Sequence, residues 1–249
     1  MDKHYYREYF EVERNHWWFK GRSEVLRSYI KDHIAKNGIL KILNVGVATG
    51  ATSVMLQSFG DVTSIEYDQD CIDYIKDKVS INVLQGSILE LPFNDNSFDL
   101  VCAFDVIEHV DDHILAVNEL TRVCANNGSV FVTVPAFISL WSEHDEINHH
   151  FRRYDVEGLR FLFKESGEIV FSSYFNSVLF LPIFLIRKLS NVFRNKNEKP
   201  KSDFQKYKPG FISSALYHLL KSESLFLNKG LKFPFGVSAL LHWRRNDQL

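Results

Sequence analysis

The 249-residue chain has few cysteines that could form disulfide bonds, and it has no long apolar run that could anchor it in a membrane. It holds three cysteines, and its longest apolar run falls well short of the about 20 residues that a membrane-spanning helix needs. Because Cys71, Cys102 and Cys124 are odd in number and widely spaced, we expect buried thiols in a reducing cytosol, without a disulfide framework or metal site. The N-terminus has no apolar core, which argues against a signal peptide and favours a cytoplasmic protein.

The chain also has no large excess of positive over negative residues, or of negative over positive ones. Its 29 Lys and Arg residues against 31 Asp and Glu residues leave a formal net charge of −2. This balance argues against broad electrostatic binding to nucleic acid, so we expect no nucleic-acid partner. The hydrophobic fraction of 45% is sufficient for a core, and the length fits one domain, with or without an appendage.

The chain is organised around residues 41–50, KILNVGVATG. A short apolar run predicts a buried parallel strand, and the small residues after it let the backbone approach a ligand closely. Residues 51–59 can then form a helix whose N-terminal N–H groups face that ligand. Glu66 follows Gly46 by about 20 residues, the offset at which a nucleotide-binding unit places a carboxylate on ribose hydroxyls.

The turn itself distinguishes between nucleoside ligands. Its pattern is Gly-x-x-x-Gly, with Ala48 in place of the middle glycine that would let a pyrophosphate lie against the backbone. The pattern therefore favours a ligand without a pyrophosphate. An ordinary tight turn in an α/β protein is the alternative.

The turn resembles the first motif of class I S-adenosylmethionine-dependent methyltransferases, in a branch similar to methyltransferase types 11 and 12. Residues 86–93 and 97–101, GSILELPF and SFDLV, resemble the third and fourth motifs of the same family. The resemblance implies S-adenosyl-L-methionine as cofactor, with Glu66 on the ribose hydroxyls and Tyr67 on the adenine face. It also implies these further cofactor-binding residues: Asn44, Gly46, Ala48, Thr49 and Gly50 in the first motif, Ser87 and Ile88 beside the adenine, and Phe104 and Asp105 in the floor.

Two positions depart from the family pattern. Ser87 stands where the family usually has an aspartate that accepts from the adenine amino group, and Asn44 replaces an acidic residue in the first strand. A hydroxyl accepts a hydrogen bond more weakly than a carboxylate does. The two changes leave open a second interpretation, a cofactor-binding scaffold protein that does not methylate, and an NAD-dependent oxidoreductase is a third.

Strand and helix patterns alternate five times, which predicts a doubly wound α/β fold with a parallel sheet. The same patterns predict helices at 23–35 and 211–227, a turn at 126–128 and a linker at 194–208. In the family fold the sheet is Rossmann-like with seven strands, six parallel and the last antiparallel. Residues 237–244 have the length for that last strand, between strands five and six. The expected domains are a helical lid at 1–35, the cofactor-binding core at 36–176, a helical apolar insertion at 177–236, and the final strand and tail at 237–249.

The N-terminal aromatic segment has two interpretations. It is either a helix docked by its aromatic residues or a lid, in which Trp18 or Phe19 covers the cofactor and Arg22 binds a carboxylate.

Residues 137–154, FISLWSEHDEINHHFRRY, follow the fifth strand and should overhang the methyl acceptor. His144 with Asp145 could orient or deprotonate a hydroxyl, and His109, beside Glu108, is a further catalytic candidate. The histidine spacing is poor for a metal site, so none is expected. Glu108 is expected to bond loop backbone, and at least one of Arg152 and Arg153 to hold the loop in place.

Residues 177–193 form an apolar segment too short to span a membrane. We expect it to pack within the chain or against a second copy, in a monomer or homodimer. The alternative is peripheral contact to a membrane surface, with Arg187 and Lys188 at the lipid headgroups. The expected reaction is methyl transfer to an oxygen, nitrogen or carbon atom of a small-molecule, sugar or lipid-linked acceptor.

Overall fold

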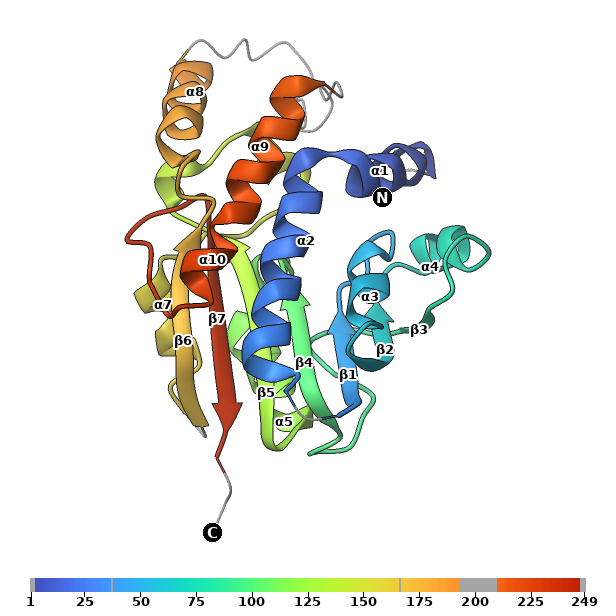
Figure 1. The fold of residues 1–249 in the computed structure, drawn as a ribbon. Helices are drawn as coiled ribbons and strands as arrows, with labels where there is room; N and C mark the ends of the chain where they lie inside the picture. Colours follow the sequence, from blue (N-terminus) through green and yellow to red (C-terminus); the bar gives the residue numbers. More distant parts are fainter. Residues whose placement is uncertain (1–2, 37, 166, 193–209, 247–249) are drawn as a thin grey trace.

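A seven-stranded sheet forms the centre of the molecule (Figure 1). The computed structural model describes residues 3–36, 38–165, 167–192 and 210–246. The strand order is β3-β2-β1-β4-β5-β7-β6. The strands are β1 (Leu40–Val45), β2 (Gly60–Glu66), β3 (Asn82–Gln85), β4 (Phe98–Phe104), β5 (Cys124–Pro135), β6 (Gly167–Phe175) and β7 (Ser238–Arg245).

The sheet confirms the predicted topology. Strands β3, β2, β1, β4 and β5 pair in parallel, whereas β7 pairs antiparallel with both β5 and β6. Because β7 lies between its two neighbours, both edges of its backbone are paired, and all of its first six residues are buried. The carboxyl ends of the parallel strands therefore meet along one edge, where ligands bind in open α/β sheets.

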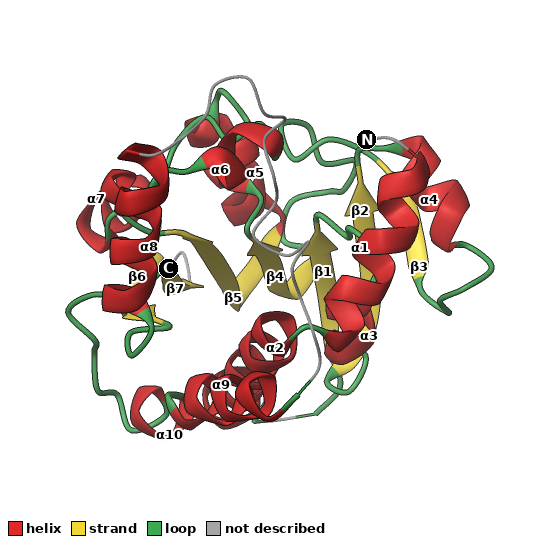
Figure 2. Cartoon of the chain, turned by 90° about the horizontal axis from the view of Figure 1, so that it is seen from above, coloured by secondary structure: helices red, strands yellow, loops and turns green. Residues whose placement is uncertain are grey.

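Helices cover both faces of the sheet (Figure 2). On one face, α2 (Trp17–Tyr29) packs with α9 (Phe211–Ser222) and α10 (Ser224–Leu227). The other face carries α5 (His113–Val123) and α7 (Val156–Leu162). The remaining helices are α1 (Lys3–Asn15), α3 (Ala51–Leu56), α4 (Gln69–Ile75), α6 (Glu143–Ile147) and α8 (Phe180–Val192), with short non-α turns at Ile30–Ile34, Ile107–His109 and Ile138–Leu140.

Each face of the sheet has its own apolar core. One contains Val25, Leu26 and Tyr29 of α2 with Phe131 of β5, and the other is centred on α5 and Trp243 of β7. These side chains are fully or almost fully buried. The cores hold the strand ends in fixed positions, which is what positions the site described below.

Three elements differ from the predictions. The second helix begins at Trp17 instead of Ser23, because His16 accepts a hydrogen bond from Trp18 N and acts as the N-cap. Strand β5 begins at Cys124, opposite Phe98, so residues 126–128, predicted as a turn, are part of the strand, with a shift in register. The predicted helix at 211–227 is interrupted at Glu223, whose carboxylate accepts from the backbone N–H groups of Asn176 and Ser177.

The apolar segment forms α8, which stands beside the carboxyl edge of the sheet (Figure 1). None of the helices in the described part of the chain is long and apolar enough to cross a bilayer. The linker predicted at 194–208 lies outside the described residues, and the domain boundaries stay predictions.

Candidate functional site

The glycine turn after β1 is fixed by the carboxylate at the end of β2. Val47 N–H and Ala48 N–H donate to Glu66 Oε2 at 3.0 and 3.1 Å, and Asp68 N–H donates to Glu66 Oε1 at 3.0 Å. Burial raises the pKa of Glu66 above its ordinary value, against the effect of these hydrogen bonds. A carboxylate has about four lone-pair sites, so Glu66 keeps an acceptor position for a further donor.

Close packing of the turn backbone against Val106 depends on Gly46. Its φ of +78° is unfavourable for residues with a Cβ, and a Cβ built there would lie 2.5 Å from Val106 Cγ2. The tip of the turn, Ala48, also has positive φ. The turn is thus held in a strained, narrow form, which costs folding energy and is typical of a ligand-binding loop.

Helix α1 docks on this turn. Arg14 donates to the Thr49 carbonyl oxygen at 2.8 Å, and Thr49 Oγ1 donates to the buried carboxylate of Glu13. Burial is the largest of the effects on Glu13, and it raises the pKa of this carboxyl. Tyr6 donates from its hydroxyl to Asp68, so α1 bridges the ends of β1 and β2. No pattern in the sequence indicated Glu13, because its partner lies in a distant segment.

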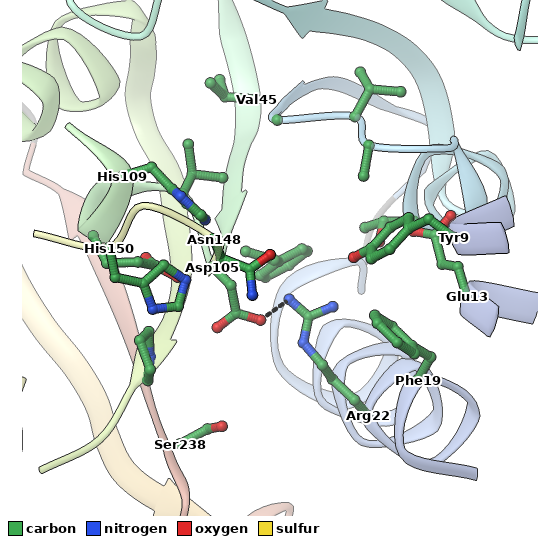
Figure 3. Close-up of a pocket in the computed structure, with 18 of the residues that line it drawn as sticks. Tyr9, Glu13, Phe19, Arg22, Val45, Asp105, His109, Asn148, His150 and Ser238 are labelled. Atoms are coloured by element: carbon green, nitrogen blue, oxygen red, sulfur yellow. Dashed lines mark ion pairs between the residues drawn. The ribbon is translucent and has the colours of Figure 1, made fainter. Parts of the chain in front are cut away.

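A cavity of about 870 Å³ opens between α1, α2 and the carboxyl ends of the strands (Figure 3). This volume is in the range for small-molecule and cofactor sites. Its lining includes most of the residues predicted for the cofactor: Trp18, Arg22, Gly46, Ala48, Thr49, Glu66, Tyr67, Ser87, Ile88, Phe104 and Asp105. The structure therefore brings these segments, far apart in the chain, to one cavity.

Two predicted cofactor residues do not line the cavity. Asn44 is buried beneath the turn, where its Nδ2 donates to Ser53 Oγ at 2.9 Å and Ser53 contacts Ser64. Gly50 lies behind the turn as the N-cap of α3. Asn44 therefore stabilises the packing of α3 against β1 and β2, and its direct contact with a ligand is not supported.

An ion pair forms part of the cavity floor. Arg22 Nη2 lies 2.5 Å from Asp105 Oδ2 and donates to Thr133 Oγ1 at 3.2 Å. The Arg22 guanidinium also lies over the rings of Trp18 and Phe104, at 5.4 and 5.7 Å from their centroids. Arg22 was predicted to meet a ligand carboxylate, and in this structure the carboxylate it meets is that of Asp105.

The loop after β5 brings its own polar network to the cavity. Asp145 Oδ1 lies 2.8 Å from both His150 Nδ1 and Arg153 Nε, and Asp145 Oδ2 accepts from Ser142 N–H at 2.9 Å. Burial opposes ionisation of Asp145, but the hydrogen bond from His150 and the charge of Arg153 prevail and lower its pKa. The histidine that Asp145 contacts here is thus His150, not the predicted His144, and the buried Arg153 holds the loop, as predicted.

His144 still lines the cavity, where Asn148 Nδ2 lies 3.2 Å from its Nε2. His109 faces the same space. The protein around the cavity desolvates its ring, and with a contribution from His150 this lowers the pKa of His109 to about 4. His109 is therefore a neutral imidazole at neutral pH, a weak proton acceptor whose lone pair can be donated to a Lewis acid.

Glu108 corrects a prediction. It was expected to bond loop backbone, yet neither carboxylate oxygen has a hydrogen-bond partner within the described residues, although the side chain is fully buried. Burial and the nearby charge of Asp105 raise its pKa well above the ordinary value. Sequence spacing could not reveal this isolation, because it depends on how the loop after β5 covers β4.

Comparisons with known proteins agree with this geometry. A family model described as a methyltransferase domain matches residues 43–132, from β1 through most of β5. An uncharacterized protein of Methanocaldococcus jannaschii is 32% identical over 177 residues, covering 63% of this chain and 74% of that protein. A demethylmenaquinone methyltransferase of Staphylococcus aureus is 30% identical over 127 residues, covering 45% of this chain and 52% of the enzyme.

The fold is shared with solved structures. An S-adenosylmethionine-dependent methyltransferase of Thermotoga maritima superposes with a TM-score of 0.58 at 17% identity, over 97% of this chain and 98% of that one. At this identity the similarity shows the fold alone. The sequence match to the S. aureus enzyme spans about half of that enzyme's length.

Proposed function

Because the chain belongs to the class I S-adenosylmethionine-dependent methyltransferases, we propose that it transfers a methyl group from this cofactor to an oxygen or nitrogen atom of a small-molecule acceptor. The observation that carries the proposal is the glycine turn with Glu66 at the wall of an 870 Å³ cavity. A carboxylate that orders the turn and keeps a free acceptor position suits a ribose hydroxyl.

The described residues fit the cofactor. A Cβ at Gly46 would collide with Val106, so glycine lets the turn pack closely against this residue after β4, and both residues line the cavity. Tyr67 is largely exposed and lines the cavity together with Ser87 and Ile88, the residues expected beside the adenine ring. The absence of a pyrophosphate-type glycine at Ala48 favours this cofactor over a dinucleotide.

The cofactor would supply an activated methyl group, so the protein's contribution is alignment of acceptor and donor. The floor formed by Arg22, Asp105 and Phe104 would fix the donor side, and α1 would limit the access of water to the turn. His144 would take a proton from an acceptor hydroxyl or amine, since histidine titrates near neutral pH. Asp145 would fix the loop that carries His144.

The nature of the acceptor is the finer part of the proposal. The named activity of the S. aureus relative, methylation of demethylmenaquinone, supports an acceptor of the small-molecule kind, and an apolar one fits the lining. Ile183, Ile186 and Arg187 of α8 line the cavity, while Leu181, Leu185 and Leu189 of the same helix are exposed. This supports an apolar or lipid-linked acceptor that enters along α8.

The experiment that tests the proposal is a transfer assay with methyl-labelled S-adenosylmethionine and a panel of quinol, sugar and lipid-linked acceptors. Formation of S-adenosylhomocysteine that depends on one acceptor class would support the proposal and identify the class. Binding of NAD in place of S-adenosylhomocysteine would contradict it in favour of an oxidoreductase.

A further inference from the structure

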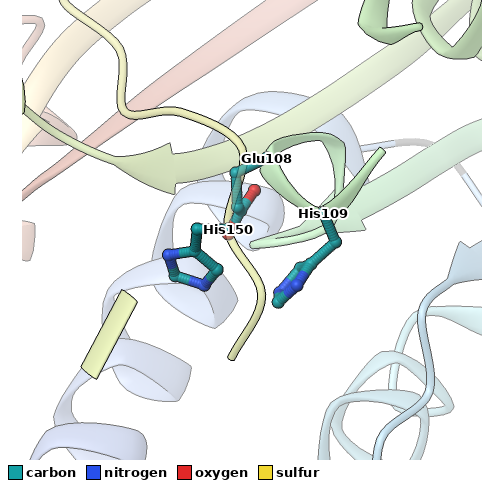
Figure 4. A group of neighbouring side chains, drawn as sticks. All are labelled: Glu108, His109 and His150. Carbon is teal, nitrogen blue, oxygen red and sulfur yellow. The ribbon is translucent and has the colours of Figure 1, made fainter. Parts of the chain in front are cut away.

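Three potential metal ligands converge at the wall of the cavity (Figure 4). Glu108 and His109 come from the turn after β4, and His150 comes from the loop after β5. One ligand atom of each lies within 4.8 Å of those of the other two. We propose that Glu108, His109 and His150 bind a divalent transition-metal cation whose open coordination positions face the cavity.

The state of Glu108 is the first independent observation. Its exposed fraction is 0%, and neither oxygen has a hydrogen-bond partner among the residues that the structure describes. A buried polar group without a partner costs free energy, and a cation among the three side chains would remove that cost. The neighbouring cations are already engaged, Arg22 with Asp105 and Arg153 with Asp145.

The orientation of His150 is the second observation. Asp145 holds its Nδ1 at 2.8 Å, which leaves Nε2 as the ring nitrogen available to a metal. Asp145 is itself fixed by Arg153 and by Ser142 N–H. Carboxylates hold metal-binding imidazoles in the same way in known metal sites, where they fix the tautomer and the ring orientation.

The donor set indicates the class of metal. Two imidazoles and one carboxylate suit zinc, iron or manganese, whereas magnesium and calcium prefer all-oxygen sites. Three protein ligands leave at least one position open, as in catalytic sites and unlike closed structural ones.

A role for the metal rests on the proposed methyl transfer. An acceptor hydroxyl bound at the open position would have a lowered pKa and would lose its proton to His144, the base proposed above, which lines the same cavity. Its oxygen then attacks the methyl carbon, so that a C–O bond forms as the C–S bond breaks and S-adenosylhomocysteine leaves. The site thus selects hydroxyl-bearing acceptors, and His109 acts as a ligand instead of a base.

The test is calorimetric titration of the chelator-treated full chain with Zn²⁺ and, separately, with Mn²⁺. We expect one site per chain. Glu108→Gln and His150→Asn should each weaken binding by at least the about 10–100-fold that loss of a supporting partner costs. The matched control is His149→Asn, because His149 is adjacent, exposed and outside the cavity lining, and Asn tolerates its positive φ. This variant should bind the metal as the parent does.

The absence of binding by both metals would overturn the proposal. Equal affinity in Glu108→Gln and His149→Asn would also overturn it, because the metal would then bind elsewhere on the surface. Thermal unfolding of each variant checks folding, and the isosteric Glu108→Gln decides the matter if His150→Asn does not fold.

Titration with S-adenosylhomocysteine separates this site from the proposed function. If the protein binds the metal but not S-adenosylhomocysteine, the methyltransferase proposal is contradicted while the metal-site proposal is supported. If the metal binds, yet the chelated protein and Glu108→Gln both transfer methyl groups as fast as the metal-loaded parent, the acceptor role of the metal is contradicted.

Discussion

Two carboxylates at the cavity, the half-buried Glu66 and the fully buried Glu108, are held in opposite ways. Glu66 accepts from three backbone N–H groups, whereas Glu108 accepts from none within the described residues. Burial raises the pKa of both groups. Glu66 is therefore already oriented by the protein, whereas Glu108 would gain a partner from the cation proposed above. Under the proposed function, this difference would separate the cofactor side of the cavity from the acceptor side.

Gly46 can be tested directly. We predict that Gly46→Ala destabilises the fold by about 1–3 kcal/mol and weakens binding of S-adenosylhomocysteine, since it adds positive-φ strain and a contact with Val106. Urea unfolding and calorimetry measure the two effects. Gly38→Ala is the matched control, because Gly38 has φ +90° but no atom within 4 Å of its Cβ position. Gly38→Ala should be destabilised by the positive-φ strain but should bind S-adenosylhomocysteine as the parent does. Equal affinities in the parent, Gly46→Ala and Gly38→Ala would contradict a role of the glycine turn in cofactor binding.

His144 is predicted to act on the acceptor and not on the cofactor. If the acceptor is a hydroxyl or amine, His144→Ala should lower kcat by about 100-fold or more, the usual contribution of a general base. Its affinity for S-adenosylhomocysteine should stay unchanged. His149→Asn, at an exposed neighbour, should keep the parent kcat. A full kcat in His144→Ala would remove this residue from the mechanism.

We predict that the free energy of unfolding depends on pH in part through the buried His242. Its Nδ1 contacts the Tyr29 hydroxyl at 3.1 Å and its Nε2 contacts Ser129 Oγ at 2.9 Å, and burial lowers its pKa to about 3. The unfolded chain binds the proton more tightly, at a pKa of about 6.5. The stability from the neutral ring is thus complete above pH ~6.5 and is lost as pH falls toward 3.

The loss should have a slope of about 1.4 kcal/mol per pH unit for this one group. Urea unfolding between pH 8 and pH 4 (roughly the range over which the ring of the unfolded chain titrates) measures it. His242→Gln should flatten the slope, and His218→Gln, at an exposed site on α9, should leave it unchanged. The same slope in parent and His242→Gln would contradict this assignment.

Among single residues, the sequence predicted those whose positions depend only on neighbouring segments of the chain. The offset from Gly46 to Glu66 is set by one βαβ unit, so it could be read from the sequence. Glu13 and His150 could not be identified, because their roles depend on Thr49 and Asp145 and on how loops far apart in the chain meet. Asn44 was misplaced for the same reason, since only the packing of α3 shows that it faces away from the cavity.

At the scale of elements, the N-terminal helices divide two tasks. Helix α1 bonds the glycine turn, whereas α2 contributes Val25, Leu26 and Tyr29 to a core against the sheet. The strands along the chain were predictable because period and turn residues mark each strand, whereas the place of β7 between β5 and β6 was implied by the resemblance to the family fold. The start of α2 was not, because a histidine N-cap is a weak sequence signal.

Helix α8 carries an unpartnered apolar face within the described structure, with Leu181, Leu185 and Leu189 exposed. Arg187, once expected at lipid headgroups, instead lines the cavity and donates to the Leu140 carbonyl oxygen at 2.8 Å. We predict that the protein floats with anionic liposomes and that Leu185→Glu with Leu189→Glu reduces flotation. Leu225→Glu, on α10, is the matched control and should float as the parent does. Protein that stays entirely in solution would contradict membrane contact.

At the scale of the whole molecule, the sheet gathers the site from distant segments. The ends of β1, β2 and β4 supply the turn, Glu66 and the floor, while the loop after β5 supplies the acceptor wall. Alternation of strands and helices predicts that these ends meet, since parallel strands share one edge. Which side chains then touch depends on tertiary packing, and Asp145 with His150 shows how one contact alters the assignment of a catalytic pair.

The most direct test of the account is calorimetric titration of the full chain with S-adenosylhomocysteine, repeated on Glu66→Gln. We predict binding to the parent, and a loss of about 1–3 kcal/mol in the variant, because its amide replaces one of the oxygens that would accept from ribose and from the turn. Asp73→Asn, on the exposed side of α4, should bind as the parent does. No heat and no thermal shift with the parent at millimolar ligand, or equal affinities in parent and Glu66→Gln, would contradict the central claim that this carboxylate and the glycine turn bind the cofactor.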